Sequence, residues 1–165
     1  MLVFLDIDGV MVQGSSWKSV ENLSDGFYKF SPNAVLGLQD IISGTKATIL
    51  LTTSHKNRYT PKEWKIIFSN RGIQVDSVSK LQTRKIYPNR KEEILTWCKR
   101  HRNVENFVII DDDKSLNGLP VELKHKLILT NSSIGLTHLD AIQAIKVLKS
   151  TKKLFKIDPK KSLSK

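Results

Sequence analysis

The sequence is poor in cysteine and lacks long apolar runs. Cys98 is the single cysteine among 165 residues, which excludes a disulfide framework and a cysteine-based zinc cluster. No stretch approaches the ~18 consecutive apolar residues that a membrane-spanning helix needs, so we expect no membrane partner. A strand-like run begins at residue 2, where a secretion signal would instead show a basic region followed by an apolar stretch. These absences predict a cytoplasmic protein.

Negative charge is also scarce. Lysine and arginine total 27 against 16 acidic residues, which gives a formal net charge of +11. Residues 146–165 contain eight lysines and one aspartate, and so carry +7 of this excess. Such a segment can bind nucleic acid through its phosphates, although a solvated, frayed terminus has the same composition. We divide the chain into one domain, residues 1–149, and a basic C-terminal tail, residues 150–165.

Short apolar segments alternate with helical patterns along the domain. The predicted strands are residues 2–6, 46–51, 73–78, 106–110 and 126–130. The predicted helices are residues 32–44, 61–70, 90–101 and 137–149. This alternation predicts an α/β fold with a mainly parallel central sheet, in which ligands bind at the carboxyl ends of the strands.

Two aspartates at the end of the first strand have a spacing that suits metal binding. Asp6 and Asp8 face the same side of an extended segment, and Gly9 permits a sharp turn directly after them. Adjacent carboxylates repel each other unless a hard divalent cation binds between them. Aspartates also cap strands without any metal, but Asp111 and Asp112 follow a second apolar strand. We therefore predict a Mg²⁺ site with Asp6, Asp8, Asp111 and Asp112 as metal-binding residues.

Hydroxyl side chains follow another predicted strand. Thr52, Thr53 and Ser54 end the second strand, where hydroxyls and backbone N–H groups can hold phosphate oxygens. Serine and threonine also favour turns for purely local reasons. The neighbouring carboxylates favour the interpretation as phosphate-binding residues.

These motifs resemble those of the haloacid dehalogenase (HAD) superfamily of phosphatases. FLDIDGV is similar to its first motif, D-x-D-G; ILLTTS resembles its second, and VIIDDD its fourth. The order and spacing agree from residue 2 to about residue 149. TSHKNR, RKEEILTWC and the late GLT make the chain similar, more narrowly, to the small HAD domain of Swiss Army knife RNA repair proteins.

The resemblance implies a role for each acidic residue. Asp6 would be the nucleophile that forms an aspartyl-phosphate, and Asp8 would be the general acid and then the general base. Mg²⁺ would be held by Asp6, the backbone carbonyl of Asp8 and Asp111, with Asp112 in support.

The resemblance also implies partners for the phosphate. Thr53 would bind the phosphoryl group, with Thr52 as the alternative after a shift of one residue. The third motif requires a lysine or arginine that neutralises charge. The candidates are, in order of preference, Arg90 and Lys91, then Lys80 and Lys85. A solvated helix face is the competing interpretation for each of the four.

The segments between the motifs are too short for a cap domain. The resemblance therefore implies a minimal, capless HAD fold, which is a Rossmann-like three-layer sandwich with an open site. An open site admits phosphates on large molecules, including the ends of nucleic acids. Aromatic residues before the first helix could stack on a base or pack within their own segment: Trp17, Phe27, Tyr28 and Phe30. Three residues after the hydroxyl turn could contact a substrate backbone or be solvated: His55, Lys56 and Arg58.

We therefore expect a Mg²⁺-dependent phosphomonoesterase whose substrates include phosphorylated RNA ends. The alternatives are a phosphatase of small metabolites or nucleotides, transfer of the phosphoryl group to an alcohol, and a non-catalytic nucleic-acid-binding module. The presence of both Asp6 and Asp8 argues against the non-catalytic alternative. The sequence predicts no particular oligomeric state.

Overall fold

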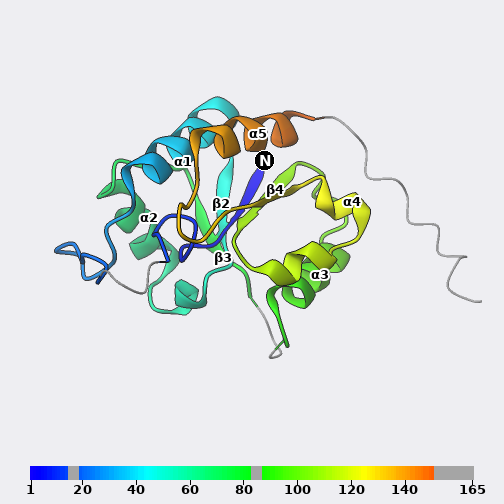
Figure 1. The fold of residues 1–165 in the computed structure, drawn as a ribbon, viewed down its shortest axis with the longest axis horizontal. Coiled ribbons are helices and arrows are strands. Elements are labelled where there is room, and N and C mark those ends of the chain that lie inside the picture. Colours follow the sequence, from blue (N-terminus) through cyan, green and yellow to red (C-terminus); the bar gives the residue numbers. More distant parts are fainter. Residues whose placement is uncertain (15–18, 83–86, 151–165) are drawn as a thin grey trace, which may run out of the picture.

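The computed structural model describes residues 1–14, 19–82 and 87–150 (Figure 1). Five strands form one sheet in the order β3-β2-β1-β4-β5, and every pairing between them is parallel. Their bounds are β1 Leu2–Leu5, β2 Thr48–Leu51, β3 Val78–Lys80, β4 Phe107–Asp111 and β5 Leu127–Leu129. This confirms the predicted α/β fold with a parallel sheet. Trp17, Lys85 and the predicted tail beyond Ser150 lie outside the described residues.

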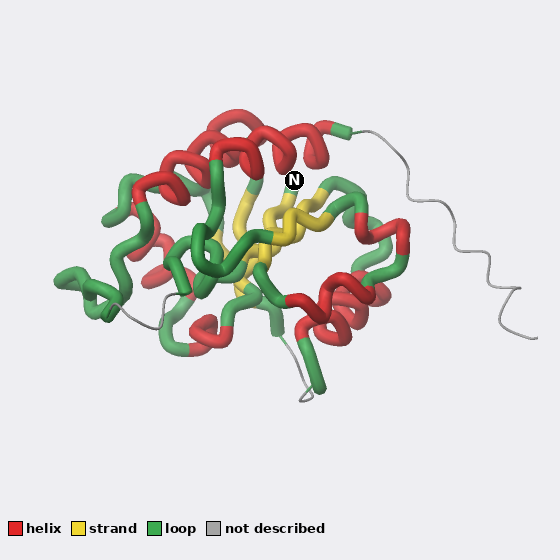
Figure 2. The backbone as a smooth tube through the Cα atoms, in the orientation of Figure 1, coloured by secondary structure: helices red, strands yellow, loops and turns green. Residues whose placement is uncertain are grey.

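Helices cover both faces of the sheet and complete a three-layer, Rossmann-like sandwich (Figures 1 and 2). One face packs against α1 (Pro32–Thr45), α2 (Pro61–Ser69) and α5 (His138–Lys149). The other packs against α3 (Arg90–Arg100), the short α4 (Val121–Lys124) and the 3-10 turn η2 (Lys114–Gly118). In the described parts of the chain, no helix is both long enough and apolar enough to span a membrane.

Side chains alternate between two buried cores along each central strand. In β1, Val3 and Leu5 join the core under α1, α2 and α5, whereas Phe4 joins the core under α3. This alternation follows from the two-residue period of a strand. Both faces are apolar because helices cover both, which explains the continuous apolar runs in the sequence.

Capping residues set where the helices begin. Thr60 and Glu63 form a capping box at the start of α2, as Thr137 and Asp140 do at the start of α5. Asn89 caps α3 by accepting a hydrogen bond from the N–H of Glu92 at 3.0 Å. The predicted helices are confirmed to within one residue at each end.

The predicted strand over residues 73–78 is wrong, because β3 begins only at Val78. Its apolar residues are buried, but the N–H groups at the start of the segment donate outside the sheet, and contact with β2 begins only where Ser77 accepts from the N–H of Ile49 at 3.1 Å. The N–H of Ile73 donates to the carbonyl of Phe68 at the end of α2, at 3.0 Å. The N–H of Gln74 donates to the side chain of Gln39 at 2.7 Å. Alternating burial therefore arises here without strand pairing.

The segment between β1 and α1 forms a hairpin over residues 21–29. The N–H of Leu23 donates to the carbonyl of Phe27 at 2.9 Å, and the N–H of Lys29 donates to that of Glu21 at 2.7 Å. Phe27 and Phe30 are buried in the core, so these two aromatic residues pack within the fold and cannot stack on a base. Within its described residues, this segment contains no helix or sheet strand that could form a cap domain.

Candidate active site

The carboxyl ends of β1, β2 and β4 bring distant polar residues to one edge of the sheet. In the register of the sheet, Leu5 lies beside Leu51 and Ile110. The next residue in each chain segment is Asp6, Thr52 or Asp111. The N–H of Asp6 donates to the carbonyl of Ile110 at 3.1 Å, and the N–H of Thr52 donates to that of Leu5 at 2.9 Å. Pairing between the strands thus continues to the point where the polar side chains begin.

Three carboxylates form a cluster at this edge. Asp6, Asp111 and Asp112 each place an oxygen within 4.8 Å of the others. Asp6 is 6% exposed and Asp111 is fully buried. Burial, reinforced by the neighbouring carboxylates, raises the pKa of Asp6 to about 6 and that of Asp111 to about 7. Among the described residues, Asp111 Oδ2 is buried without a hydrogen-bond partner. Clustered carboxylates that are costly to ionise fit a hard divalent cation such as Mg²⁺.

Gly9 allows Asp112 to approach the first motif closely. Gly9 has a φ of +73°, and a Cβ built on it would lie 2.1 Å from Asp112 Oδ2. Its N–H donates to the carbonyl of Val12 at 2.7 Å, and Thr130 Oγ1 donates to the carbonyl of Gly9 at 2.8 Å. Hydrogen bonds to both the N–H and the carbonyl of Gly9 therefore hold the turn after Asp8 in place. A side chain at Gly9 would displace the Asp112 carboxylate.

Asp8 places its carboxylate outside the cluster of Asp6, Asp111 and Asp112. Asp8 Oδ2 lies 2.9 Å from His55 Nε2, and the Asp8 side chain is 54% exposed. The resemblance to HAD phosphatases implies that Asp8 binds metal through its backbone carbonyl, and that role stays a prediction. An exposed carboxyl beside a buried one suits a group that exchanges protons with water.

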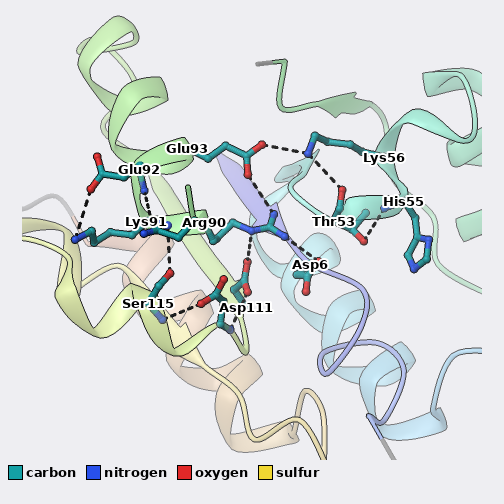
Figure 3. A network of polar contacts seen from close by, with 12 residues as sticks. Asp6, Thr53, His55, Lys56, Arg90, Lys91, Glu92, Glu93, Asp111 and Ser115 are labelled. Carbon is teal, nitrogen blue, oxygen red and sulfur yellow. Dashed lines mark hydrogen bonds and ion pairs between the residues drawn. The ribbon is translucent and has the colours of Figure 1, made fainter. Parts of the chain in front are cut away.

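Arg90 is the cation that lies at the carboxylate cluster (Figure 3). Its Nε lies 3.5 Å from Asp111 Oδ2, and its Nη2 lies 3.6 Å from Asp6 Oδ1. Its Nη1 lies 3.7 Å from Glu93 Oε2, one helical turn further along α3. The Asn89 cap makes Arg90 the first residue of α3, which places its side chain at the carboxyl edge of the sheet.

The other candidate cations turn elsewhere. Lys91 Nζ lies 3.5 Å from Glu92 Oε1, and the N–H of Lys91 donates to Ser115 Oγ at 3.4 Å (Figure 3). Lys80 Nζ donates to the carbonyl of Tyr59 at 3.3 Å. Among the four candidates for the third motif, the structure therefore brings Arg90 to the cluster and leads Lys91 and Lys80 away from it.

Glu93 pairs with two cations beside the site, Arg90 and Lys56, a role that the sequence patterns did not predict. Lys56 Nζ lies 3.1 Å from Glu93 Oε1, and each of the two side chains is 12% exposed. Lys56 belongs to the 3-10 turn η1 (Ser54–Asn57), so this ion pair connects η1 to α3. The sequence does contain one indication of this contact: Arg90 and Glu93 are three residues apart on a predicted helix, a spacing that places two side chains next to each other.

The hydroxyls after β2 differ in what they contact. Thr53 Oγ1 caps η1 by accepting a hydrogen bond from the N–H of His55 at 3.3 Å. Thr52 Oγ1 is buried and, within the described parts of the chain, has no hydrogen-bond partner. Ser54 is exposed at the start of η1. Phosphate binding by Thr53, Thr52 and Ser54 stays a prediction, and Thr52 offers the hydroxyl that is not already bonded.

Comparison with known families agrees with this geometry. Residues 2–141 match the model of the family described as the HAD domain in Swiss Army Knife RNA repair proteins. No curated protein and no solved structure matches the chain. The match includes the acidic ends of β1 and β4 and the hydroxyl turn after β2. The chain therefore belongs to the family of HAD domains found in Swiss Army Knife RNA repair proteins.

Proposed function

We propose that this protein is a Mg²⁺-dependent phosphomonoesterase that acts through an aspartyl-phosphate on Asp6. The observation that carries the proposal is the convergence of Asp6, Asp111 and Asp112 with Arg90 at one edge of the sheet. Membership of the HAD family supports phosphatase chemistry in general. The finer points of cation, intermediate and substrate are our inference from the site.

The residues present fit a bound Mg²⁺. Asp6, Asp111 and Asp112 supply carboxylate oxygens, which Mg²⁺ prefers as ligands. The buried Oδ2 of Asp111 accepts no hydrogen bond among the described residues, and Arg90 Nε lies 3.5 Å from it, so a cation could still bind there. When bound, the cation would neutralise the carboxylates and the incoming phosphate.

The side chains around the cluster account for the two chemical steps. Asp6 attacks phosphorus, and the bond to the leaving oxygen breaks as Asp8 donates a proton to that oxygen. Asp8 then takes a proton from the water that attacks the phosphorus, which releases inorganic phosphate and restores the Asp6 carboxylate. Thr52 Oγ1 is buried without a hydrogen-bond partner among the described residues, so it can donate to a phosphate oxygen. Arg90 Nη1 also makes no hydrogen bond there, since Glu93 Oε2 lies 3.7 Å away, so the guanidinium can turn a donor toward the phosphate.

Phosphorylated RNA ends are the substrate class that we propose. The family description names RNA repair, the half-exposed Asp8 lies at an open edge, and the chain carries a net charge of +11. A test is a phosphatase screen with Mg²⁺ over nucleotides, sugar phosphates, and 3′- and 5′-phosphorylated oligonucleotides. We expect turnover that EDTA abolishes and that Asp6→Asn lacks. Full activity in EDTA, or in purified Asp6→Asn, would contradict the proposal.

The basic tail separates a polymeric substrate from a small one. Removal of residues 150–165 should raise KM for a phosphorylated oligonucleotide and flatten its salt dependence, by roughly 0.7 in slope for each lost phosphate contact. Turnover of an aryl phosphate should stay nearly unchanged, because that ligand reaches only the Asp6 site. Equal effects on both substrates would indicate a structural role for the tail. If neither substrate responds, a small phosphomonoester becomes the better assignment.

A further inference from the structure

His55 contacts the proposed acid–base residue directly. Its Nε2 lies 2.9 Å from Asp8 Oδ2, although the two residues are 47 positions apart in the sequence. Within the described residues, this is the one hydrogen bond or ion pair that the Asp8 side chain makes. Because Asp8 is half exposed, little else restricts its rotamer.

The fold holds His55 more firmly than it holds Asp8. The N–H of His55 donates to Thr53 Oγ1 at 3.3 Å, and its side chain is 18% exposed. The imidazole lies edge-to-face against Phe27 and Tyr28, with ring centroids 5.6 Å and 5.4 Å apart. Such contacts fix the plane of the ring.

A buried arginine in turn anchors these two aromatic residues. Arg71 donates to the carbonyl of Tyr28 at 2.7 Å and to that of Phe27 at 2.9 Å. It also forms a two-pronged pair with Asp25 in the same hairpin, at 2.6 Å and 3.0 Å. The hairpin of residues 21–29 is thereby tied to the end of α2, with its aromatic residues against the His55 ring.

We propose that His55 is a positioning residue that holds the Asp8 carboxyl in one orientation for proton transfer to and from the substrate. The inference rests on the proposed function, in which Asp8 acts first as acid and then as base. With its proton on Nε2, a neutral imidazole donates to Asp8 Oδ2, which leaves the other carboxyl oxygen, Oδ1, to carry the proton that is transferred. The contact can therefore persist in both protonation states of Asp8, and a fixed orientation reduces the entropy lost in the transition state.

Substrates with different leaving groups distinguish a role of His55 in positioning Asp8 from a general role of His55 in the structure. kcat/KM reports the steps up to departure of the leaving group, in which Asp8 supplies a proton. Departure of an alkoxide needs that proton, whereas departure of 4-nitrophenolate scarcely does. His55→Phe keeps a ring against Phe27 and Tyr28 but removes the nitrogen. We expect it to lower kcat/KM by about tenfold or more for an alkyl phosphate or a phosphorylated oligonucleotide, as a fraction of a full acid–base contribution. For 4-nitrophenyl phosphate the loss should stay within about twofold.

Matched variants control for the substitution itself. His55→Gln places an amide where Nε2 lies and should recover most of the alkyl phosphate activity. His125→Phe makes the same change at an exposed position after α4 and should affect neither substrate. Equal losses on both substrates, or no loss on either, would overturn the proposal. Thermal unfolding should confirm that His55→Phe remains folded.

A crystal structure would test the contact between His55 and Asp8 independently of whether the protein is a phosphatase. If the wild-type protein hydrolyses neither substrate, the proposed function fails, and the position of Asp8 still tests the contact. The wild-type structure should show Asp8 Oδ2 bonded to His55 Nε2, and His55→Phe should show the carboxylate in other rotamers. A wild-type carboxylate turned away from His55 would contradict the proposal.

Discussion

Arg90 Nη2 lies 3.6 Å from Asp6 Oδ1, so the first residue of α3 places its guanidinium against the carboxylate that ends β1. The same guanidinium reaches Asp111 at 3.5 Å. A single cation therefore contacts carboxylates from two neighbouring strands (Figure 3). In the proposed reaction it also faces the phosphate that Asp6 attacks.

Arg90→Ala should reduce kcat/KM for any phosphomonoester by roughly 10²-fold or more, as loss of a preorganised charge does elsewhere. Lys91→Ala is the matched control on the neighbouring residue, since Lys91 pairs with Glu92 away from the cluster. Steady-state kinetics on an aryl phosphate would measure both. Comparable losses in the two variants would show that Arg90 has no special role.

Gly9→Ala should weaken Mg²⁺ binding, because its Cβ would meet Asp112 Oδ2 at 2.1 Å. Gly72 provides a control, since it also has a positive φ, of +80°, but a Cβ there would have no neighbour within 4 Å. Both variants bear a backbone cost of about 1 kcal/mol. Only Gly9→Ala should raise the Mg²⁺ concentration for half-maximal activity. An equal rise in both would indicate that strain alone is responsible.

The stability of the metal-free protein should fall as pH rises from about 4 to about 7. The pKa values of Asp6 and Asp111 lie above the ordinary aspartate value, so the folded state binds their protons more tightly than the unfolded state does. Mg²⁺ binds the ionised forms, and its stabilising effect should therefore grow over the same range. Melting temperatures with and without Mg²⁺ would measure this, with Asp111→Asn as the control in which both trends weaken. A Mg²⁺ effect that is independent of pH would contradict the assignment.

Arg71 should stabilise the hairpin of residues 21–29 far more than the exposed ion pair between Lys29 and Glu21 does. Arg71→Met leaves Asp25 without its partner and removes donors to two carbonyls, which should cost about 3–5 kcal/mol in the free energy of unfolding. Lys29→Ala breaks an exposed pair with Glu21 and should cost less than about 1 kcal/mol. Denaturant titration of both variants would measure the difference, and similar costs would show that burial of Arg71 is unimportant.

The sequence predicted those parts of the site that follow from strand ends. Asp6 and Asp111 meet because parallel strands bring their carboxyl ends to one edge, and the helix predicted over residues 90–101 does begin at Arg90. The sequence misplaced β3, because residues before it are buried by packing and not by strand pairing.

Contacts between loops could not be predicted from sequence patterns. The approach of His55 to Asp8 depends on the turn after β2 and on the hairpin that packs against the ring. Neither has a period or spacing that links it to the first motif. The 3-10 turns η1 and η2 are also too short to show a helical pattern.

The most direct test of the central claim is chemical trapping of phosphorylated Asp6. During turnover with Mg²⁺ and a substrate, rapid acid quenching followed by borohydride reduction converts an aspartyl-phosphate into homoserine. Mass spectrometry of the peptide that contains residue 6 should then show homoserine in place of Asp6. When substrate is omitted, the same peptide should contain unmodified aspartate. Sustained hydrolysis with Asp6 unmodified at every quench time, together with activity in Asp6→Asn, would contradict the account.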